Sequence, residues 1–344
     1  DQIIVSWTDI SGGKTYDVPL DIVHFGNVTL QNGEEVPGMY LQWHYATPFG
    51  VRFDQNEAFY VASEAELPAG TYNITVGTNW GTNCKAGEKY QFVLTKPVPQ
   101  GGMLVGFYGM PDNTYDKWRV SSYLDGAATE AIETVTPTAG SAGTSLGTFT
   151  LAGDASLNSL HRLTYGYNRW SHSALRQFLN SDKPAGQWWS SKNKFDRAPY
   201  EHATKAGFLS GFEDEFLSCI QPIKVTTALN TVTDTADGET EDTYDTFFLP
   251  SLEQMYITPQ LAGEGEAFEY WKRASGVTSK MEQGSAYPQI RTFAIENHTS
   301  PQSVRLRSAN RGSGSSTRYV NSSGYVYGDY AISAYRFAPV CVVC

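Results

Sequence analysis

Short runs of β-branched and aromatic residues alternate with turn signals along the first 97 residues. The turn signals include Ser11-Gly12-Gly13 and Asn32-Gly33, which are typical of tight connections between strands. The runs between them share a length suited to single strands: QIIVSW, YDVPLDIVHF, GMYLQWHYA, AFYVAS, TYNITVG and YQFVLTK. This regular spacing predicts a β-sandwich-like mounting domain over residues 1–97.

The pattern stays β-rich between residues 98 and 155. The segment KPVPQGG at 96–102 has the composition of a linker, and MLVGFYG, KWRVSSYL and AIETVTP read as further strands. A polar loop, TPTAGSAGTSLG, follows at 136–147. The sequence leaves open whether 98–155 is a separate domain or an extension of a neighbour, and we treat it as a β linker or extension region.

Helical periodicity appears only after residue 156. SHSALRQFLNSD predicts an amphipathic helix with Ser171 as its N-cap and Ala174, Leu175 and Phe178 on one face. SGFEDEFLSCI predicts a second helix, which a capping box between Ser210 and Glu213 would open. A third short helix is expected near residue 251, and GEAFEYWKRASG adds a turn. The fold class is therefore a mainly β N-terminal region followed by an α+β domain at 156–344.

The composition of the segment 308–337 is unusual for either a core strand or a flexible tail. Of its 30 residues, 18 are Ser, Gly, Tyr or Asn, and Lys, Glu, Gln, Met and Trp are absent. Tyrosine supplies a large amphipathic contact area at low entropic cost, while Ser, Gly and Asn supply adaptable hydrogen bonds. This mixture predicts a binding surface. The alternative is a set of structured loops whose tyrosines pack on the domain's own surface.

The predicted ligand-binding residues are the aromatic and polar members of this segment. They are Asn310, Arg311, Ser313, Ser315, Ser316, Tyr319, Tyr325, Tyr327, Asp329, Tyr330, Ser333, Tyr335 and Arg336. The apolar members are assigned to the core instead: Val320, Val326, Ile332 and Phe337.

Charge and hydropathy narrow the classes of partner. The formal net charge is −11 and Lys/Arg clusters are missing, which argues against nucleic acid. No apolar run reaches the length of about 18 residues that a membrane span needs. The sequence opens at Asp1, so it carries no information about a signal or anchor before that residue.

The four cysteines are too few for a disulfide framework. Cys341 and Cys344 have C-x-x-C spacing, which could indicate redox or metal chemistry, but they lie in the apolar run APVCVVC that reads as a terminal strand. Cys84 and Cys219 are isolated in the sequence. Packing of the terminal strand is the favoured interpretation.

Other candidate chemistry is weak. The acidic loop 234–245 could bind calcium, but its spacing fails the EF-hand pattern and a solvated loop is favoured. The six histidines lack metal-ligand spacing, and no G-x-S-x-G nucleophile elbow is present. Trp170, Trp188, Trp189 and Phe178 could line a cofactor pocket, although such rings are more often core. We therefore predict no catalytic residues, no metal site and no cofactor.

The segments NRWSHSALRQFLNS, FLPSLEQMY, EGEAFEYWK, VRLRSAN and YRFAPVCVV resemble the DUF6273-type domains of gut bacteria and their phages. The segments DIVHFG, MYLQWHYATPFGV and GGMLVGFYG are similar to the leading part of phage and prophage proteins with that domain. The resemblance implies a C-type-lectin-like fold, related to that of formylglycine-generating enzymes. It covers most of the chain.

Proteins of that fold include the variable proteins of diversity-generating retroelements, among them phage receptor-binding tips. In these, adenine-directed mutagenesis randomises AAC codons to NNC, which cannot encode Lys, Glu, Gln, Met or Trp. Those are the five residue types absent from 308–337. The resemblance therefore implies a display protein on a virion or on the outside of a bacterium. Its partner would be a protein or glycan on a host or competitor cell, and related tips imply a homotrimer.

Two alternatives come from other classes. The first is a fixed structural or decoration protein of a phage virion, which would form a stable hetero-oligomer. The second is a copper oxidase similar to the formylglycine-generating enzymes, which use a cysteine pair to bind copper. Because a shared fold does not transfer activity, we favour the binding protein over the enzyme.

Overall fold

The chain folds into two compact units. The computed structural model describes residues 1–56, 59–61, 65–77, 86–98, 103–107, 120–124, 131–135, 138–149, 162, 165–192 and 196–344. Unit 1 consists of residues 1–54, 168–190 and 199–344, and unit 2 of residues 55–167 and 191–198. The predicted fold class is confirmed: the N-terminal part forms β-sheets and the C-terminal part is α+β.

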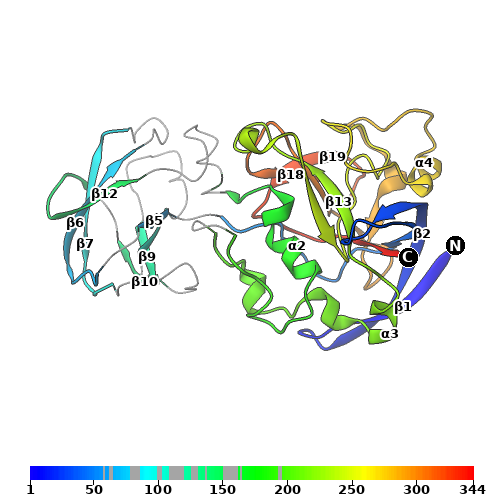
Figure 1. Ribbon diagram of the computed structural model, residues 1–344, viewed down its shortest axis with the longest axis horizontal. Helices are drawn as coiled ribbons and strands as arrows, with labels where there is room; N and C mark the ends of the chain where they lie inside the picture. The colour runs from blue at the N-terminus through cyan, green and yellow to red at the C-terminus, as the bar shows by residue number, and fades with distance from the viewer. Residues whose placement is uncertain are drawn as a thin grey trace. The chain divides into compact units, whose positions relative to one another are not determined.

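The main sheet of unit 1 joins the two ends of the sequence. Its strand order is β1-β2-β3-β21, and these strands are β1 (Gln2–Asp9), β2 (Lys14–Thr29), β3 (Glu35–Trp43) and β21 (Val340–Val343). Figure 1 shows the red C-terminal strand running beside the blue strands of the N-terminal hairpin. This grouping differs from the predicted domain over 1–97, because β3 pairs with β21 rather than with a strand from residues 55–97.

The other strands of unit 1 form small antiparallel sheets. They are β4 (Val51–Arg52) with β20 (Ala334–Tyr335), β13 (Ile223–Ala228) with β14 (Thr240–Asp245), β15 (Thr292–Phe293) with β16 (Pro301–Gln302), and the three strands β17 (Val304–Ala309), β18 (Ser316–Val320) and β19 (Val326–Tyr330). The described α-helices are short: α2 (Ala174–Leu179), α3 (Asp214–Leu217) and α4 (Glu269–Ser275).

Aromatic rings fill the core of unit 1. Phe208 is at the centre, with ring contacts at centroid distances of 5.4 Å to Trp7, 5.4 Å to Trp43 and 5.2 Å to Phe247. Phe178 of α2 packs 5.9 Å from the same ring. Because Trp7 and Trp43 come from β1 and β3, this cluster ties the N-terminal hairpin to the C-terminal region. Trp170 and Trp188 are also buried, which agrees with the prediction that these tryptophans are core residues.

The helix α2 begins two residues later than predicted. Its N-cap is Ser173, whose hydroxyl accepts a hydrogen bond from the backbone N–H of Arg176 at 3.1 Å. The predicted N-cap, Ser171, instead bonds the side chain of Glu241, from another part of the chain. The Ser171 hydroxyl therefore makes a tertiary contact and does not cap the helix.

The predicted capping box is wrong as well. The helix α3 is a single turn with Glu213 as its N-cap residue, and no side-chain hydrogen bond caps it. The hydroxyl of Ser210 donates to the carbonyl of Gly207, inside a preceding 3₁₀ turn at Phe208–Gly211. Phe208, which belongs to this turn, is buried in the core.

Unit 2 contains two four-stranded sheets, ordered β10-β9-β8-β5 and β11-β7-β6-β12. Their strands are β5 (Phe59–Val61), β6 (Gly70–Val76), β7 (Lys89–Leu94), β8 (Met103–Phe107), β9 (Val120–Leu124), β10 (Ala131–Val135), β11 (Thr138–Ala139) and β12 (Thr144–Phe149). Residues 98–155 thus fall in one unit with β5, β6 and β7, a grouping that the sequence left open. The predicted linker lies partly outside the described residues, and Cys84 lies wholly outside them.

Candidate functional site

A row of four tyrosines lies on one face of the sheet formed by β17, β18 and β19. Tyr319 of β18 is paired in register with Tyr327 of β19. Tyr325 stacks on Tyr327 at a centroid distance of 5.6 Å and an interplanar angle of 7°, and Tyr335 stacks on Tyr319 at 4.7 Å and 23°. Tyr319 and Tyr327 are 6.5 Å apart, which joins the two stacked pairs. We call these four residues the tyrosine row.

The alternation of side chains along β18 and β19 separates this row from the core. Val320 and Val326 neighbour the tyrosines in sequence and point to the opposite face, where both are buried, as predicted. Tyr327 is 42% exposed, and the other three tyrosines of the row are half-buried. Phe337 is also in the core, whereas Ile332 is only half-buried, so its assignment to the core is not confirmed.

A buried arginine supports one end of the tyrosine row. The guanidinium of Arg305 lies 4.4 Å from the centroid of the Tyr335 ring and donates to the hydroxyl of Thr317 at 2.7 Å. It also donates to the backbone carbonyls of Tyr330 at 3.0 Å and Ser333 at 2.7 Å. Burial lowers the pKa of Arg305 to about 10, which leaves it charged at neutral pH. The arginine therefore fixes both the ring and the backbone of the turn after β19.

Asp329 holds the hydroxyl of Tyr335. The phenol donates to the Asp329 carboxylate at 2.8 Å. Burial, this hydrogen bond and the carboxylate charge together raise the pKa of Tyr335 above its ordinary value. Stacking on one side, the arginine on another and the carboxylate at the hydroxyl restrict the rotamers of Tyr335. A surface ordered before binding loses less entropy when a partner docks.

Five predicted site residues are thus brought together: Tyr319, Tyr325, Tyr327, Asp329 and Tyr335. Tyr330 is the last residue of β19 and is 39% exposed. The turn that contains Ser333 is attached through its carbonyl to Arg305.

Ser315 and Ser316 do not belong to an accessible surface, and their assignment as ligand-binding residues is wrong. Ser315 is 0% exposed and Ser316 is 8% exposed. The reason is the side chain of Asn168, whose amide donates to the carbonyls of Ser316 at 2.8 Å and Ser313 at 2.7 Å. These bonds draw the turn before β18 into the interior.

The remaining polar residues lie away from the tyrosine row. The side chain of Asn310 accepts from Arg318 at 3.1 Å, and Arg318 alternates with Tyr319 along β18, so both lie on the opposite face of the sheet. Arg336 forms a bidentate ion pair with Glu296, at 2.7 and 2.8 Å. Arg311 lies 3.8 Å from Glu239.

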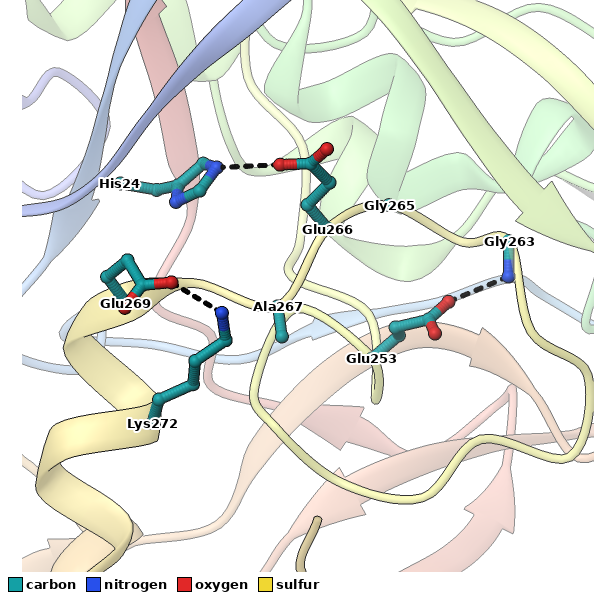
Figure 2. Close-up of a pocket in the computed structure, with 8 residues that line it drawn as sticks. All are labelled: His24, Glu253, Gly263, Gly265, Glu266, Ala267, Glu269 and Lys272. Carbon is teal, nitrogen blue, oxygen red and sulfur yellow. Dashed lines mark hydrogen bonds and ion pairs between the residues drawn. The ribbon is translucent and has the colours of Figure 1, made fainter. Parts of the chain in front are cut away.

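A pocket that the sequence did not indicate lies between β2, the loop 263–267 and α4. Its lining side chains are drawn in Figure 2: His24, Glu253, Glu266, Ala267, Glu269 and Lys272, together with Gly263 and Gly265. An adjoining cleft of ≈ 220 Å³ continues between residues 26–29 of β2 and residues 223–226 of β13. His24 and Glu266 belong to the walls of both.

A β-bulge directs His24 toward this pocket. The register between β2 and β3 shifts after Ile22, so that Val23 is extra and His24 faces Tyr40. The ring of His24 then lies over Gly26, where a Cβ atom would approach Nε2 to 3.0 Å. Nε2 is 3.3 Å from the Glu266 carboxylate, as Figure 2 shows. In the sequence, this arrangement is marked by a glycine, Gly26, two residues after His24.

The pocket has unused hydrogen-bonding capacity. A carboxylate only accepts, so a neutral His24 donates from Nε2 and keeps Nδ1 as an acceptor. Nδ1 is buried and has no hydrogen-bond partner among the described residues. Nearby, burial and the charge of Glu266 raise the pKa of Tyr40 to about 12, so its phenol stays protonated.

The segment 234–245, which the sequence suggested is a solvated acidic loop, ends in strand β14, and two of its carboxylates are buried. Asp245 is 0% exposed and accepts from Trp170 Nε1 at 2.9 Å and from Arg176 at 2.6 Å. Asp234 is buried and accepts from Asn230 at 2.8 Å. In the part of the chain that the structure describes, no group of three or more His, Cys, Asp or Glu residues is arranged to hold a metal ion.

The C-x-x-C cysteines do not face each other. Cys341 is completely buried in β21, and burial raises the pKa of its thiol. Cys344 follows the end of the strand and is exposed. Residues three apart on an extended chain point to opposite faces, which accounts for the difference.

Comparison with known proteins gives one match. A family model described as a domain of unknown function, DUF6273, matches residues 147–343. Neither the curated proteins nor the solved structures yield a match. Among the described residues, no helix is long and apolar enough to cross a membrane.

Proposed function

The chain belongs to the DUF6273 family, and on that premise we propose that it is a binding protein whose contact surface is the tyrosine row. The observation that carries the proposal is the ordered stack of four tyrosines on the outer face of a small sheet. Tyr and Arg dominate the energetically important positions of protein interfaces, and stacked rings present edges and hydroxyls that bind without reordering.

The finer parts of the proposal concern the fold family, the source of variation and the partner. We infer a C-type-lectin-like domain whose surface is rewritten by a diversity-generating retroelement. The division of 316–330 into buried valines and outward tyrosines supports this, because variation on the outer face would leave the core unchanged. The partner is a protein or glycan on a host or competitor cell, and the protein is displayed on a virion or a bacterial surface, as a homotrimer by family analogy.

The proposed role is not enzymatic. The copper-oxidase alternative requires two cysteines that can bind one metal ion together. Cys341 is buried and Cys344 is exposed beyond the end of the strand, so the geometry gives that alternative no support. The fixed virion protein is distinguished from the diversified one by the experiments that follow.

Replacing one exposed ring, Tyr327, and one half-buried ring, Tyr325, tests the binding surface. The full chain, fluorescently labelled, is applied to a glycan array and to a panel of bacterial cells, and the best binder is titrated. We expect the double variant Tyr325→Ser, Tyr327→Ser to lose about 30-fold in affinity or more, the equivalent of about 2 kcal/mol. Its thermal transition should stay within a few degrees of the parent, because Tyr327 is 42% exposed and Tyr325 is not part of the buried core.

Tyr200→Ser is the matched control. Tyr200 is 75% exposed, belongs to the same unit and lies outside the tyrosine row. The Tyr200→Ser variant should bind the partner with the same affinity as the parent. An equal loss of affinity in the control, or loss of the thermal transition in the double variant, would contradict a binding role for the row.

Sequencing the 3′ end of the gene and its downstream DNA across the source population tests the diversification. We expect substitutions concentrated in codons for outward residues such as Tyr319, Tyr325 and Tyr327, opposite adenines in a nearby near-identical repeat. Codons for Val320 and Val326 should not vary. A uniform 3′ end without such a repeat would favour the fixed virion protein.

A further inference from the structure

Two cysteines that are far apart in the sequence flank a single antiparallel β-bridge at the end of β21, Cys219 in the turn before it and Cys344 after it. Ile220 and Val343 form an antiparallel β-bridge, and the N–H of Gln221 donates to the carbonyl of Val342 at 3.4 Å. In an antiparallel pair, one step back on one strand is opposite one step forward on the other. The residue before Ile220 is Cys219, and the residue after Val343 is Cys344.

This register provides the spacing of a disulfide. Residues directly opposite in an antiparallel pair have Cα atoms about 4.5–5.5 Å apart, within the range of about 4.4–6.8 Å that disulfides bridge. Both thiols are free and exposed. We propose that Cys219 and Cys344 form a disulfide that ties the end of β21 to the segment that follows α3.

The third described cysteine cannot compete for either partner. Cys341 is completely buried, and burial raises the pKa of its thiol, which suppresses the thiolate that exchange requires. Cys219 has only a weak contact to give up, since its Sγ donates to the carbonyl of Glu215 at 3.4 Å. Formation of the disulfide requires the Cys219 side chain to rotate away from that carbonyl.

The oxidant we invoke is a small-molecule disulfide such as glutathione disulfide. One cysteine thiolate attacks it, which forms a mixed disulfide and releases one glutathione thiolate. The second cysteine thiolate then attacks the protein sulfur and releases the other glutathione thiolate. Two protein thiols are oxidised, one glutathione disulfide is reduced to two glutathione molecules, and the two protons pass to the departing thiolates.

The cross-link would enclose most of the site-bearing part of unit 1. The chain between Cys219 and Cys344 contains β13, α4 and the tyrosine row. A bond that closes so long a loop restricts the unfolded chain and raises the stability of the folded one. The display surface would then resist unfolding under oxidising conditions.

The test uses the full chain, incubated with glutathione disulfide at about pH 9, because partial burial raises the pKa of the Cys344 thiol and exchange requires the thiolate. Remaining thiols are alkylated, and the protein is digested without reduction and analysed by mass spectrometry. We expect a peptide pair linked through Cys219 and Cys344, loss of two alkylatable thiols, and reversal by dithiothreitol. The thermal midpoint of the oxidised protein should be several degrees above that of the reduced protein.

Single substitutions identify the bond. Cys219→Ser and Cys344→Ser should each abolish both the linked peptide and the rise in thermal midpoint, whereas Cys341→Ser should retain the linked peptide. The proposal is overturned if Cys219 and Cys344 stay free, carry only glutathione, or link to Cys84, to Cys341 or to a second copy of the chain.

Discussion

We expect Arg307→Ala to lower the free energy of unfolding by about 3–5 kcal/mol, because a buried charged donor that bonds several buried acceptors is removed. Arg307 is 1% exposed, and all five of its N–H donors bond within the protein. Its acceptors come from three segments: the Thr227 hydroxyl at 3.2 Å, the carbonyls of Thr226 at 3.1 Å and Leu249 at 2.8 Å, the Gln254 side chain at 2.5 Å, and the Glu264 carbonyl.

The size of this loss follows from what the truncation leaves behind. Alanine removes every donor at once, so buried carbonyls on β13 and on the loop before α4 lose their partners, each at a cost of about 1–3 kcal/mol. The ring of Phe248, 5.6 Å from the guanidinium, would then border an empty space. Urea unfolding, followed by tryptophan fluorescence, measures the change.

The loss of unfolding free energy in Arg307→Ala should also depend on pH. Glu264 is completely buried, and burial raises the pKa of its carboxyl, while the charge of Arg307 lowers it. Without Arg307 the folded-state pKa rises further above the ordinary value of 4.5. A carboxyl whose pKa is raised in the folded state costs stability as the pH increases from its pKa in the unfolded chain to its pKa in the folded protein. The deficit of the variant should therefore be smaller near pH 4.5 than at about pH 8.

Arg273→Ala is the matched control, since Arg273 is an exposed arginine on α4 of the same unit. It should change the free energy of unfolding by about 0.5 kcal/mol or less. Comparable losses in the two variants, or a deficit at Arg307 that does not change with pH, would contradict a buried network centred on Arg307.

Asp245→Ala is the second large effect, with an expected loss of about 3 kcal/mol in the free energy of unfolding. One carboxylate oxygen accepts from Trp170 Nε1 at 2.9 Å and from the Thr243 hydroxyl at 2.7 Å, and the other accepts from Arg176 at 2.6 Å. Its side chain is 0% exposed. Truncation leaves the buried indole N–H unpaired and removes the anionic partner of Arg176, which secures α2.

The neighbouring strand residue Asp242 offers a control of the same type. Its side chain is 48% exposed and lies 3.5 Å from Lys224. An exposed pair of this kind contributes about 1 kcal/mol or less, so Asp242→Ala should be close to the parent. Both variants are compared by urea unfolding and by near-ultraviolet circular dichroism, which reports on the packing of the aromatic side chains, Trp170 among them. Equal losses would mean that the acidic loop acts through its overall charge rather than through the contacts of Asp245.

The sequence alone predicts the fold class, and it predicts which residues of 316–330 face the core and which face outward. Alternating β-branched and aromatic runs predicted the strands, because one face of each must be apolar to be buried. The same alternation separates Val320 and Val326 from Tyr319 and Tyr327, so the local pattern was enough to divide core from surface. The composition of 308–337 predicts that Tyr319, Tyr325, Tyr327 and Tyr335 belong to one binding surface, without any knowledge of the contacts between them.

Local patterns failed where a distant residue competes for the same group. Ser171 had the spacing of an N-cap, but Glu241 takes its hydroxyl. Ser315 and Ser316 had the composition of a binding loop, but Asn168 draws that turn inward. In each case the competing partner is about 70 or more residues away, as with the separations of 70 and 148 residues for Glu241 and Asn168.

What the sequence by itself determined was therefore the strand pattern, the α+β character of the C-terminal region and the tyrosine-rich surface, because each depends on neighbours within a few residues. Only the tertiary structure decided the pairing of β3 with β21, the buried position of Arg307, the pocket at His24 and the β-bridge between Ile220 and Val343. These four features depend on which distant segments share a sheet or a core, and packing of the whole chain fixes that choice.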